Sequence, residues 1–237
     1  MKNPIYKLVK VKVKIAGNQV LDLRKVEIHR GSCYVIYGDI GSGKTTLLNL
    51  LSRKGMDIEG EVHYDGNDIK AVASSTLKGE IYHLSQSTKD PWFNPSVESY
   101  INKAISTHKH ISEPAKRFKD VVRNMKLKSL LDRNYKNLSD GEKRWIELAA
   151  AIACDTKVLI IDGFGQYLSE DKIKLLSRIL YRKVNYDGST LIIGTHVKEK
   201  LNRIASVYIK LDRGKIVSVR SKSKSKSRSK PKRYNKK

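Results

Sequence analysis

The chain has 237 residues, of which 39% are hydrophobic and 30% are charged, which is enough apolar content for one large globular domain. No apolar run approaches the roughly 18 to 20 residues that span a bilayer, which excludes an integral membrane protein. Two separated cysteines, Cys33 and Cys154, exclude a disulfide or metal framework and are expected to be buried. We therefore expect a cytoplasmic protein that reaches a membrane only through a partner chain.

The formal net charge of +24 is unevenly distributed along the chain. Residues 220–237 contain ten Lys or Arg and no acidic residue, which leaves a net charge of +14 on residues 1–219. The Ser/Lys alternation of this segment cannot bury apolar surface, so we predict a disordered tail. Two roles remain open for it, namely solubility, or attraction to the phosphates of anionic lipid or nucleic acid.

The first part of the chain is rich in predicted strands. Period-two alternation predicts a strand at 7–15 and another at 19–28, and residues 32–38 form a third run that is apolar on both faces. Such a run is typical of a central strand in a parallel sheet. A helix is predicted at 45–55, and short strands at 59–69 and 79–87.

The rest of the chain alternates helices and strands. Apolar spacings of three and four predict helices within 95–137, which we interpret as an inserted helical subdomain at about 95–140. A helix at 141–153, a strand at 157–162, a helix at 170–184, a strand at 189–195 and a hairpin at 205–219 follow. This order predicts an α/β fold in which a mostly parallel core carries an antiparallel β edge layer, with one domain over residues 1–219.

A glycine-rich loop joins the third predicted strand to the first predicted helix. It fits G-x-x-x-x-G-K-[ST], the phosphate-binding loop, and its candidate ligand residues are Gly38, Asp39, Ile40, Gly41, Ser42, Gly43, Lys44, Thr45 and Thr46. Backbone N–H groups and the helix N-terminus attract phosphates, Lys44 reaches the β and γ phosphates, and Thr45 offers its hydroxyl to Mg²⁺. The loop predicts a P-loop NTPase.

An aspartate ends the predicted strand at 157–162. In a phosphate-loop protein, Asp162 at this position suits the coordination shell of Mg²⁺, because the metal compensates the desolvated carboxylate. Without the loop, a helix cap or a turn would be the favoured explanation of this residue. The two motifs together predict an Mg²⁺–nucleotide site.

Five motifs follow one another along the chain: GDIGSGKT, Gln86 in IYHLSQS, the LSDGE segment at 138–142, VLIID, and His196 in LIIGTH. In this order they resemble the nucleotide-binding subunit of an ATP-binding cassette (ABC) protein. The resemblance covers about residues 1–219 and implies a RecA-like core that binds ATP and Mg²⁺. It also implies a second ABC subunit, as a homodimer or heterodimer, and a separate membrane permease at the inner face of a membrane.

The resemblance also implies roles for single residues. Ser139, Gly141 and Glu142 belong to the loop that contacts the γ-phosphate of ATP held by the other subunit. Gln86 matches the residue that joins Mg²⁺ to the membrane partner, and His196 matches the histidine that orients the attacking water. Taken alone, LSDGE is an ordinary helix cap, Gln86 a surface residue and His196 a structural residue.

Three features depart from the family pattern. Gly163 stands where the family places a glutamate as general base, a loss that typically costs about 10² to 10⁴ in rate, so Gly163→Glu is predicted to accelerate hydrolysis. Asp140 replaces a glycine of the family loop. No aromatic residue near Lys14 and Ile15 is available to stack on adenine, and Tyr6 is only a distant substitute.

These features predict an ATP-binding subunit of an ABC-type transporter or membrane complex whose own site hydrolyses ATP slowly. The alternative is a soluble nucleic-acid- or ribosome-associated ABC ATPase that uses its basic tail. Trp92 and Phe93, in the segment between Gln86 and Tyr100, indicate either a docking patch for the membrane partner or local core.

Overall fold

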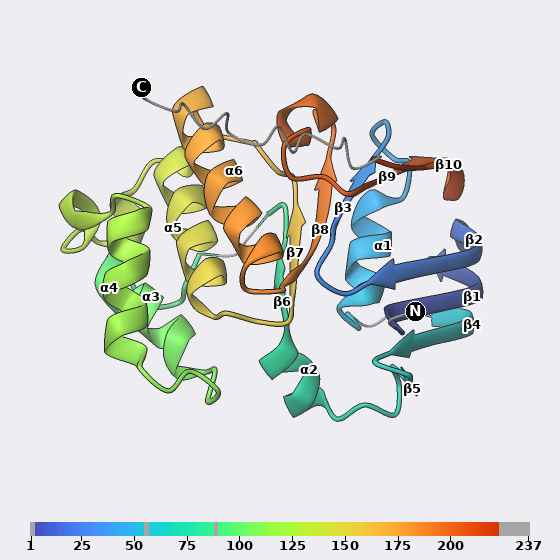
Figure 1. Cartoon of the computed structure of the whole chain (residues 1–237), viewed down its shortest axis with the longest axis horizontal. Helices are drawn as coiled ribbons and strands as arrows, with labels where there is room; N and C mark the ends of the chain where they lie inside the picture. The colour runs from blue at the N-terminus through green and yellow to red at the C-terminus, as the bar shows by residue number, and fades with distance from the viewer. Residues whose placement is uncertain (1–2, 55–56, 88–89, 223–237) are drawn as a thin grey trace, which may run out of the picture.

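The computed structural model describes residues 3–54, 57–87 and 90–222, which form two β-sheets with helices between and outside them (Figure 1). The strands are β1 (Pro4–Ile15), β2 (Asn18–His29), β3 (Cys33–Tyr37), β4 (Asp57–Tyr64), β5 (Asn67–Asp68), β6 (Ile81–Leu84), β7 (Val158–Asp162), β8 (Thr190–Thr195), β9 (Val207–Asp212) and β10 (Lys215–Ser221). The helices are α1 (Lys44–Leu51), α2 (Ser74–Glu80), α3 (Val97–Ser106), α4 (Pro114–Asn124), α5 (Asp140–Ala153) and α6 (Glu170–Asn185), with 3₁₀ turns η1 (Lys128–Leu130), η2 (Tyr135–Asn137) and η3 (Lys198–Leu201).

The larger sheet has six strands in the order β10-β9-β3-β8-β7-β6. β3 pairs in parallel with β8 and β9, and β7 pairs in parallel with β6 and β8, whereas β10 is antiparallel to β9. All five residues of β7 are buried, because helices cover both faces of this sheet. The predicted mostly parallel core is confirmed, and the carboxyl ends of β3, β7 and β8 meet at its upper edge in Figure 1.

The smaller sheet is antiparallel, with the order β2-β1-β4-β5. Along β1, Val11 and Val13 are buried while Lys12 between them is exposed, as a sheet with one covered face requires. The buried side chains of this sheet pack on α1, whose opposite side contacts β7 and β8. α1 therefore lies between the two sheets, and the predicted antiparallel edge layer is confirmed.

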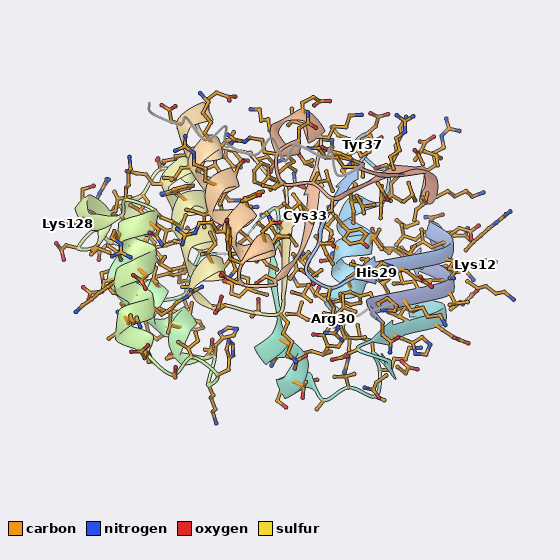
Figure 2. The ribbon with its side chains drawn as sticks, in the orientation of Figure 1. Lys12, His29, Arg30, Cys33, Tyr37 and Lys128 are labelled. Carbon is orange, nitrogen blue, oxygen red and sulfur yellow. The ribbon has the colours of Figure 1, made fainter. Side chains whose placement is uncertain are left out.

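The second face of the larger sheet is covered by α3, α5 and α6, with α4 outside them (Figure 1). Exposed Lys128 of this helical side and Lys12 of the antiparallel sheet mark opposite ends of the molecule, with Cys33 in the interior between them (Figure 2). Cys33 and Cys154 are both buried, as expected, and burial raises the pKa of both thiols, that of Cys154 to about 12. Neither thiol is poised for metal binding or redox chemistry.

Two features differ from the elements expected from sequence. Helix α2 was not predicted, because only Leu77 of its seven residues is buried and its sequence carries no apolar periodicity. Strand β10 continues to Ser221, and residues 223–237 of the expected tail lie outside the described residues. No helix in the described part of the chain is both long and apolar enough to cross a bilayer.

Candidate functional site

The glycine-rich loop occupies residues 38–43, between the end of β3 and the start of α1. Gly43 caps α1 with a φ of 98°, and a Cβ at this position would lie 2.8 Å from Leu21 Cδ2. Only glycine fits a left-handed position so close to β2. Ile40 and Gly41 are exposed, whereas Ser42 is buried and its N–H donates to Asp39 O over 3.1 Å. The N-terminus of α1 thus opens onto a tight loop with an exposed tip, as phosphate binding requires.

Lys44 lies across this loop. Its ammonium donates hydrogen bonds to Gly38 O (2.8 Å), Asp39 O (2.7 Å) and Ser42 Oγ (3.2 Å). Burial lowers the pKa of Lys44, and the nearby carboxylates of Asp162 and Asp39 oppose that shift. A cation held mostly by neutral oxygen atoms gains a stronger partner when phosphate oxygens compete for it.

Thr45 and Asp162 meet across two elements. Thr45 Oγ1 at the start of α1 donates to Asp162 Oδ2 at the end of β7 over 2.7 Å. Asp162 is only 2% exposed, and no ion pair within 4 Å involves it in the described residues. A buried carboxylate that lacks an ion pair is costly unless a cation compensates it. This hydroxyl–carboxylate pair therefore fits Mg²⁺, which prefers one or two protein oxygen ligands and completes its shell with water and phosphate.

A metal held by protein side chains alone is a poorer fit to this site. Among the described residues no group of three or more His, Cys, Asp or Glu side chains is arranged to hold a metal ion. The oxygen pair of Thr45 and Asp162 is too small for a complete coordination shell, so a metal ion bound here would take its remaining ligands from nucleotide and water.

The chain turns sharply after Asp162. Gly163 and Gly165 have φ values of 71° and 84°, and the N–H of Gln166 donates to Gly163 O over 3.3 Å. Buried Phe164 anchors the turn in the core, and its N–H donates to Gly194 O over 3.0 Å. A residue other than glycine would be strained at 163. No carboxylate follows Asp162 directly, as the sequence already states.

Gln86 and His196 lie at the same edge of the sheet. Gln86 is exposed after β6, and its Cγ would lie 3.1 Å from a Cβ placed on Gly163, so it adjoins the end of β7. His196 follows β8 directly and is exposed, without a side-chain hydrogen bond among the described residues. The topology therefore brings Gln86 against Gly163 and places His196 directly after the next strand, β8.

The LSDGE segment forms the N-terminus of α5. Ser139 Oγ accepts a hydrogen bond from the N–H of Glu142 (3.3 Å), and Glu142 Oε2 accepts one from the N–H of Ser139 (2.9 Å), which completes a capping box. This backbone hydrogen bond is the main cause that lowers the pKa of Glu142. A Cβ on Gly141 would lie 2.6 Å from Tyr167 O, so the glycine permits close contact with the turn after β7.

Arg144 on α5 is a site residue that sequence reasoning missed. It is 4% exposed and donates to Ser85 O at the end of β6 (2.7 Å) and to Asp162 O at the end of β7 (2.5 Å). It also forms a buried ion pair with Glu147 (3.3 Å). One guanidinium thus fixes the two strand ends that carry Gln86 and Asp162. The feature of the sequence that could have indicated Arg144 is the presence of an arginine within the apolar helix GEKRWIELAAAIA.

Tyr6 is excluded as a substitute for an adenine-stacking aromatic. Its ring is fully buried against Tyr64, with centroids 5.1 Å apart, and its hydroxyl donates to Leu51 O over 2.8 Å. At the turn between β1 and β2, where the family aromatic was expected, Ile15 is the exposed apolar side chain. An aliphatic side chain provides apolar contact for a base without aromatic stacking.

Sequence comparison places the chain among ATP-binding proteins. The sequence model described as ABC transporter matches residues 21–163. A tungstate uptake system ATP-binding protein of Peptoclostridium acidaminophilum is 27% identical, over 87% of this chain and 94% of its own length. An energy-coupling factor transporter ATP-binding protein of Thermotoga maritima is 29% identical, over 81% and 73% of the two chains. Another relative, a putative ABC transporter ATP-binding protein of Treponema denticola, is longer, and the match covers 42% of it.

Solved structures share the fold. The ATP-binding subunit of an ABC transporter superposes with a TM-score of 0.81 at 18% identity, over 92% of this chain and 90% of that chain. A dimeric ATP-binding cassette in a post-hydrolysis state with ADP and phosphate gives a TM-score of 0.79 at 21% identity, over 91% and 98%. The α/β phosphate-loop fold expected from sequence is therefore confirmed. Because the family match spans more than half of the sequence, the chain belongs to the ABC transporter family and carries its ATP-binding domain.

Proposed function

We propose that this chain is the ATP-binding subunit of an ABC-type transporter or membrane complex, and that its own site holds ATP with Mg²⁺ and cleaves ATP slowly. The observation that carries the proposal is the 2.7 Å hydrogen bond between Thr45 and buried Asp162, beside the loop crossed by Lys44. This hydrogen bond joins the start of α1 to the end of β7, the two elements on which Mg²⁺–nucleotide binding depends.

The proposed roles follow from the position of each residue. Residues 38–46 bind the triphosphate through backbone N–H groups and the N-terminus of α1, with Lys44 on the β and γ phosphates. Thr45 and Asp162 hold Mg²⁺, and Gln86 reaches it from the neighbouring strand end. When bound, Mg²⁺ neutralises charge that develops on the phosphate oxygens. His196, exposed after β8, orients the attacking water or contacts the γ-phosphate.

Slow hydrolysis at this site follows from Gly163. Members of this family are ATP-hydrolysing enzymes, and a positioned general base contributes about 10² to 10⁴ in rate. Here the residue after Asp162 has no side chain, and its φ of 71° disfavours any residue that would supply one. Water activation, rather than ATP binding, is the step that this site weakens.

A second subunit completes the site in this proposal. Ser139 is exposed at the N-terminus of α5, and the helix dipole and free N–H groups there attract a phosphate of ATP held by a partner. Gly141 and Glu142 belong to the same helix turn. Exposed Asp140 adds a negative charge beside that phosphate and weakens the contact. In a homodimer both sites lack the base, whereas in a heterodimer this LSDGE segment serves an intact site on the partner.

We propose that Trp92 and Phe93 form part of the surface that docks a membrane permease. Their side chains are 91% and 74% exposed, so they are not local core. Neighbouring exposed aromatic residues are typical of protein interaction sites. The chain would then lie on the cytoplasmic face of a membrane, peripherally, through that partner. A solved structure with the same fold, cbiO1 from Clostridium perfringens, is part of the ABC transporter complex cbiONQ, and this supports such an assembly.

We further propose that the ATP-binding domain, expected over residues 1–219, extends to Ser221 where β10 ends, with a helical subdomain at about 95–140. We also propose that the ten cations of residues 220–237 attract anionic phosphate. Binding to vesicles that contain anionic lipid and binding to a single-stranded RNA, measured separately, distinguish lipid phosphate from nucleic-acid phosphate. Binding that weakens with salt and is lost on removal of residues 223–237 supports the electrostatic role. Binding that survives this truncation contradicts it.

Two experiments test the main proposal. Fluorescent ATP titrated into the purified protein should bind in an Mg²⁺-dependent manner and lose affinity in Lys44→Ala, with Lys119→Ala on the exposed face of α4 as the matched control. Purification of the native complex should bring down a multi-span permease. A protein that binds no ATP, or that is recovered with nucleic acid and no permease, contradicts the proposal.

A further inference from the structure

Gln166 carries a polar atom that the proposed site does not yet use. Among the described residues, four buried side-chain atoms have no hydrogen-bond partner: His83 Nε2, His108 Nε2, Ser177 Oγ and Gln166 Oε1. Buried polar atoms without partners are rare in folded proteins and usually mark an ordered water or a functional group. Of these four, Gln166 Oε1 is the one that belongs to the turn directly after Asp162.

The carboxamide of Gln166 occupies the space above Gly163. A Cβ placed on Gly163 would lie 2.6 Å from Gln166 Oε1, 3.0 Å from Gln166 Cδ and 3.1 Å from Gln86 Cγ. Two glutamine side chains from different loops therefore converge on the bare backbone of Gly163. This point adjoins Asp162, whose carboxylate accepts the hydrogen bond from Thr45.

The backbone fixes this position. The hydrogen bond from Gln166 N–H to Gly163 O closes the turn, and buried Phe164 holds it on the core. The backbone of Gln166 is therefore held by the fold. The left-handed φ of Gly163 leaves no side chain at 163, which gives the carboxamide its room.

A glutamine oxygen at this point suits a water molecule. It accepts a hydrogen bond from water but is too weak a base to take its proton. Other phosphate-loop NTPases orient the attacking water with a glutamine. We infer that Gln166 orients the attacking water in this chain's own ATP site, in the space left bare by Gly163. The inference rests on the proposed function.

The reaction balances without a base on Gln166. The water oxygen forms a bond to the γ-phosphorus, the bond from that phosphorus to the β–γ bridging oxygen breaks, and ADP leaves with the electron pair. The water protons pass to the inorganic phosphate and to solvent. Gln166 fixes the direction of attack and takes no proton, so the site is slow but not inert.

The test compares Gln166→Leu, which keeps the approximate volume but removes the acceptor, with Asn124→Leu at an exposed position of α4 as the matched control. We expect Gln166→Leu to bind Mg²⁺–ATP within about twofold of the parent and to unfold at no lower temperature, since it removes an unpartnered buried oxygen. Its single-turnover cleavage should fall roughly tenfold or more, and its affinity for ADP with orthovanadate, a mimic of the transition state, should fall with it.

A second variant at the same position is expected to raise the rate of cleavage. Gln166→Glu places a carboxylate where the water is held, so cleavage should rise at least tenfold and should increase with pH as that carboxyl ionises. If Gln166→Leu unfolds at a lower temperature, Gln166→Asn, which withdraws the same acceptor, replaces it in both assays.

The outcomes separate the two proposals. Normal ATP binding with unchanged cleavage and vanadate affinity in the Leu or Asn variant overturns the inference about Gln166 alone. Failure of the parent protein to bind ATP overturns the proposed function instead. A parallel loss in Asn124→Leu also contradicts the inference, because it would show a nonspecific effect.

Discussion

Replacement of Arg144 by methionine tests how the helix α5 supports the nucleotide site. The guanidinium donates to Ser85 O and Asp162 O and pairs with Glu147, and both members of that pair are 5% exposed. Methionine keeps an unbranched apolar side chain, shorter than that of arginine, and removes every donor. Glu147 keeps the hydrogen bond from the Tyr135 hydroxyl (2.8 Å) but loses its buried cation.

Removal of one member of a buried ion pair costs roughly 3 to 5 kcal/mol. With an m-value of about 3 kcal/mol/M, this loss lowers the urea midpoint by roughly 1 to 1.7 M. The double variant Arg144→Met/Glu147→Gln should recover part of the loss, with a coupling of about 1 to 3 kcal/mol in a double-mutant cycle. Mg²⁺-dependent ATP affinity should fall as well, because Asp162 loses the donor to its carbonyl.

The matched control is Arg123→Met on α4, whose arginine is 76% exposed and pairs with Asp120 on the surface. Surface pairs contribute at most about 1 kcal/mol, so this variant should change the midpoint little. A loss below 1 kcal/mol in Arg144→Met, or no coupling to Glu147, would refute the assignment of Arg144 as the link between α5 and the two strand ends.

Four further predictions test single features of the site and the fold. Thr45→Val should weaken ATP binding about tenfold in Mg²⁺ but leave binding in EDTA unchanged, and an equal loss in both would argue against a metal-linked hydroxyl. Ser139→Ala should cost about 1 kcal/mol of unfolding free energy through loss of the helix cap, and a cost near zero would contradict the capping box. Burial, together with nearby Lys54, lowers the pKa of His83 from 6.5 to about 3, so its contribution to stability is complete above pH 6.5 and is lost as pH falls toward 3. His83→Gln should reduce the pH dependence of the unfolding free energy, measured in urea, over that range. An unchanged loss of stability at acid pH in this variant would exclude His83 as its source. Gly163→Glu should lower the melting temperature by roughly 2 to 8 °C, because residue 163 has a left-handed φ. Its gain in hydrolysis rate should stay below that of Gln166→Glu, and a larger gain would show that the turn rearranges freely.

The local parts of the fold and site follow from the sequence. β3 and β7 are continuous apolar runs, and the glycine loop carries its own conformational requirement at Gly43, so each is specified by neighbouring residues. The order of motifs then places Lys44 and Asp162 at one sheet edge, because parallel strands present their carboxyl ends together.

Contacts between distant segments could not be predicted in this way. Arg144 lies 18 residues before Asp162 on an apolar helix, and nothing local indicates that it donates to that carbonyl. The position of Gln166 over Gly163 depends on left-handed φ angles in the turn, which a sequence permits but does not impose. Helix α2 has a single buried residue and therefore no periodicity to detect.

The most direct test of the account is single-turnover ATP cleavage by the purified protein, beside an ABC cassette that carries glutamate after its strand aspartate. We predict tight Mg²⁺-dependent ATP binding that requires Lys44, with cleavage about 10² to 10⁴ slower than in the comparison protein. Cleavage at the rate of the comparison protein would contradict the central claim that Gly163 limits hydrolysis and not binding.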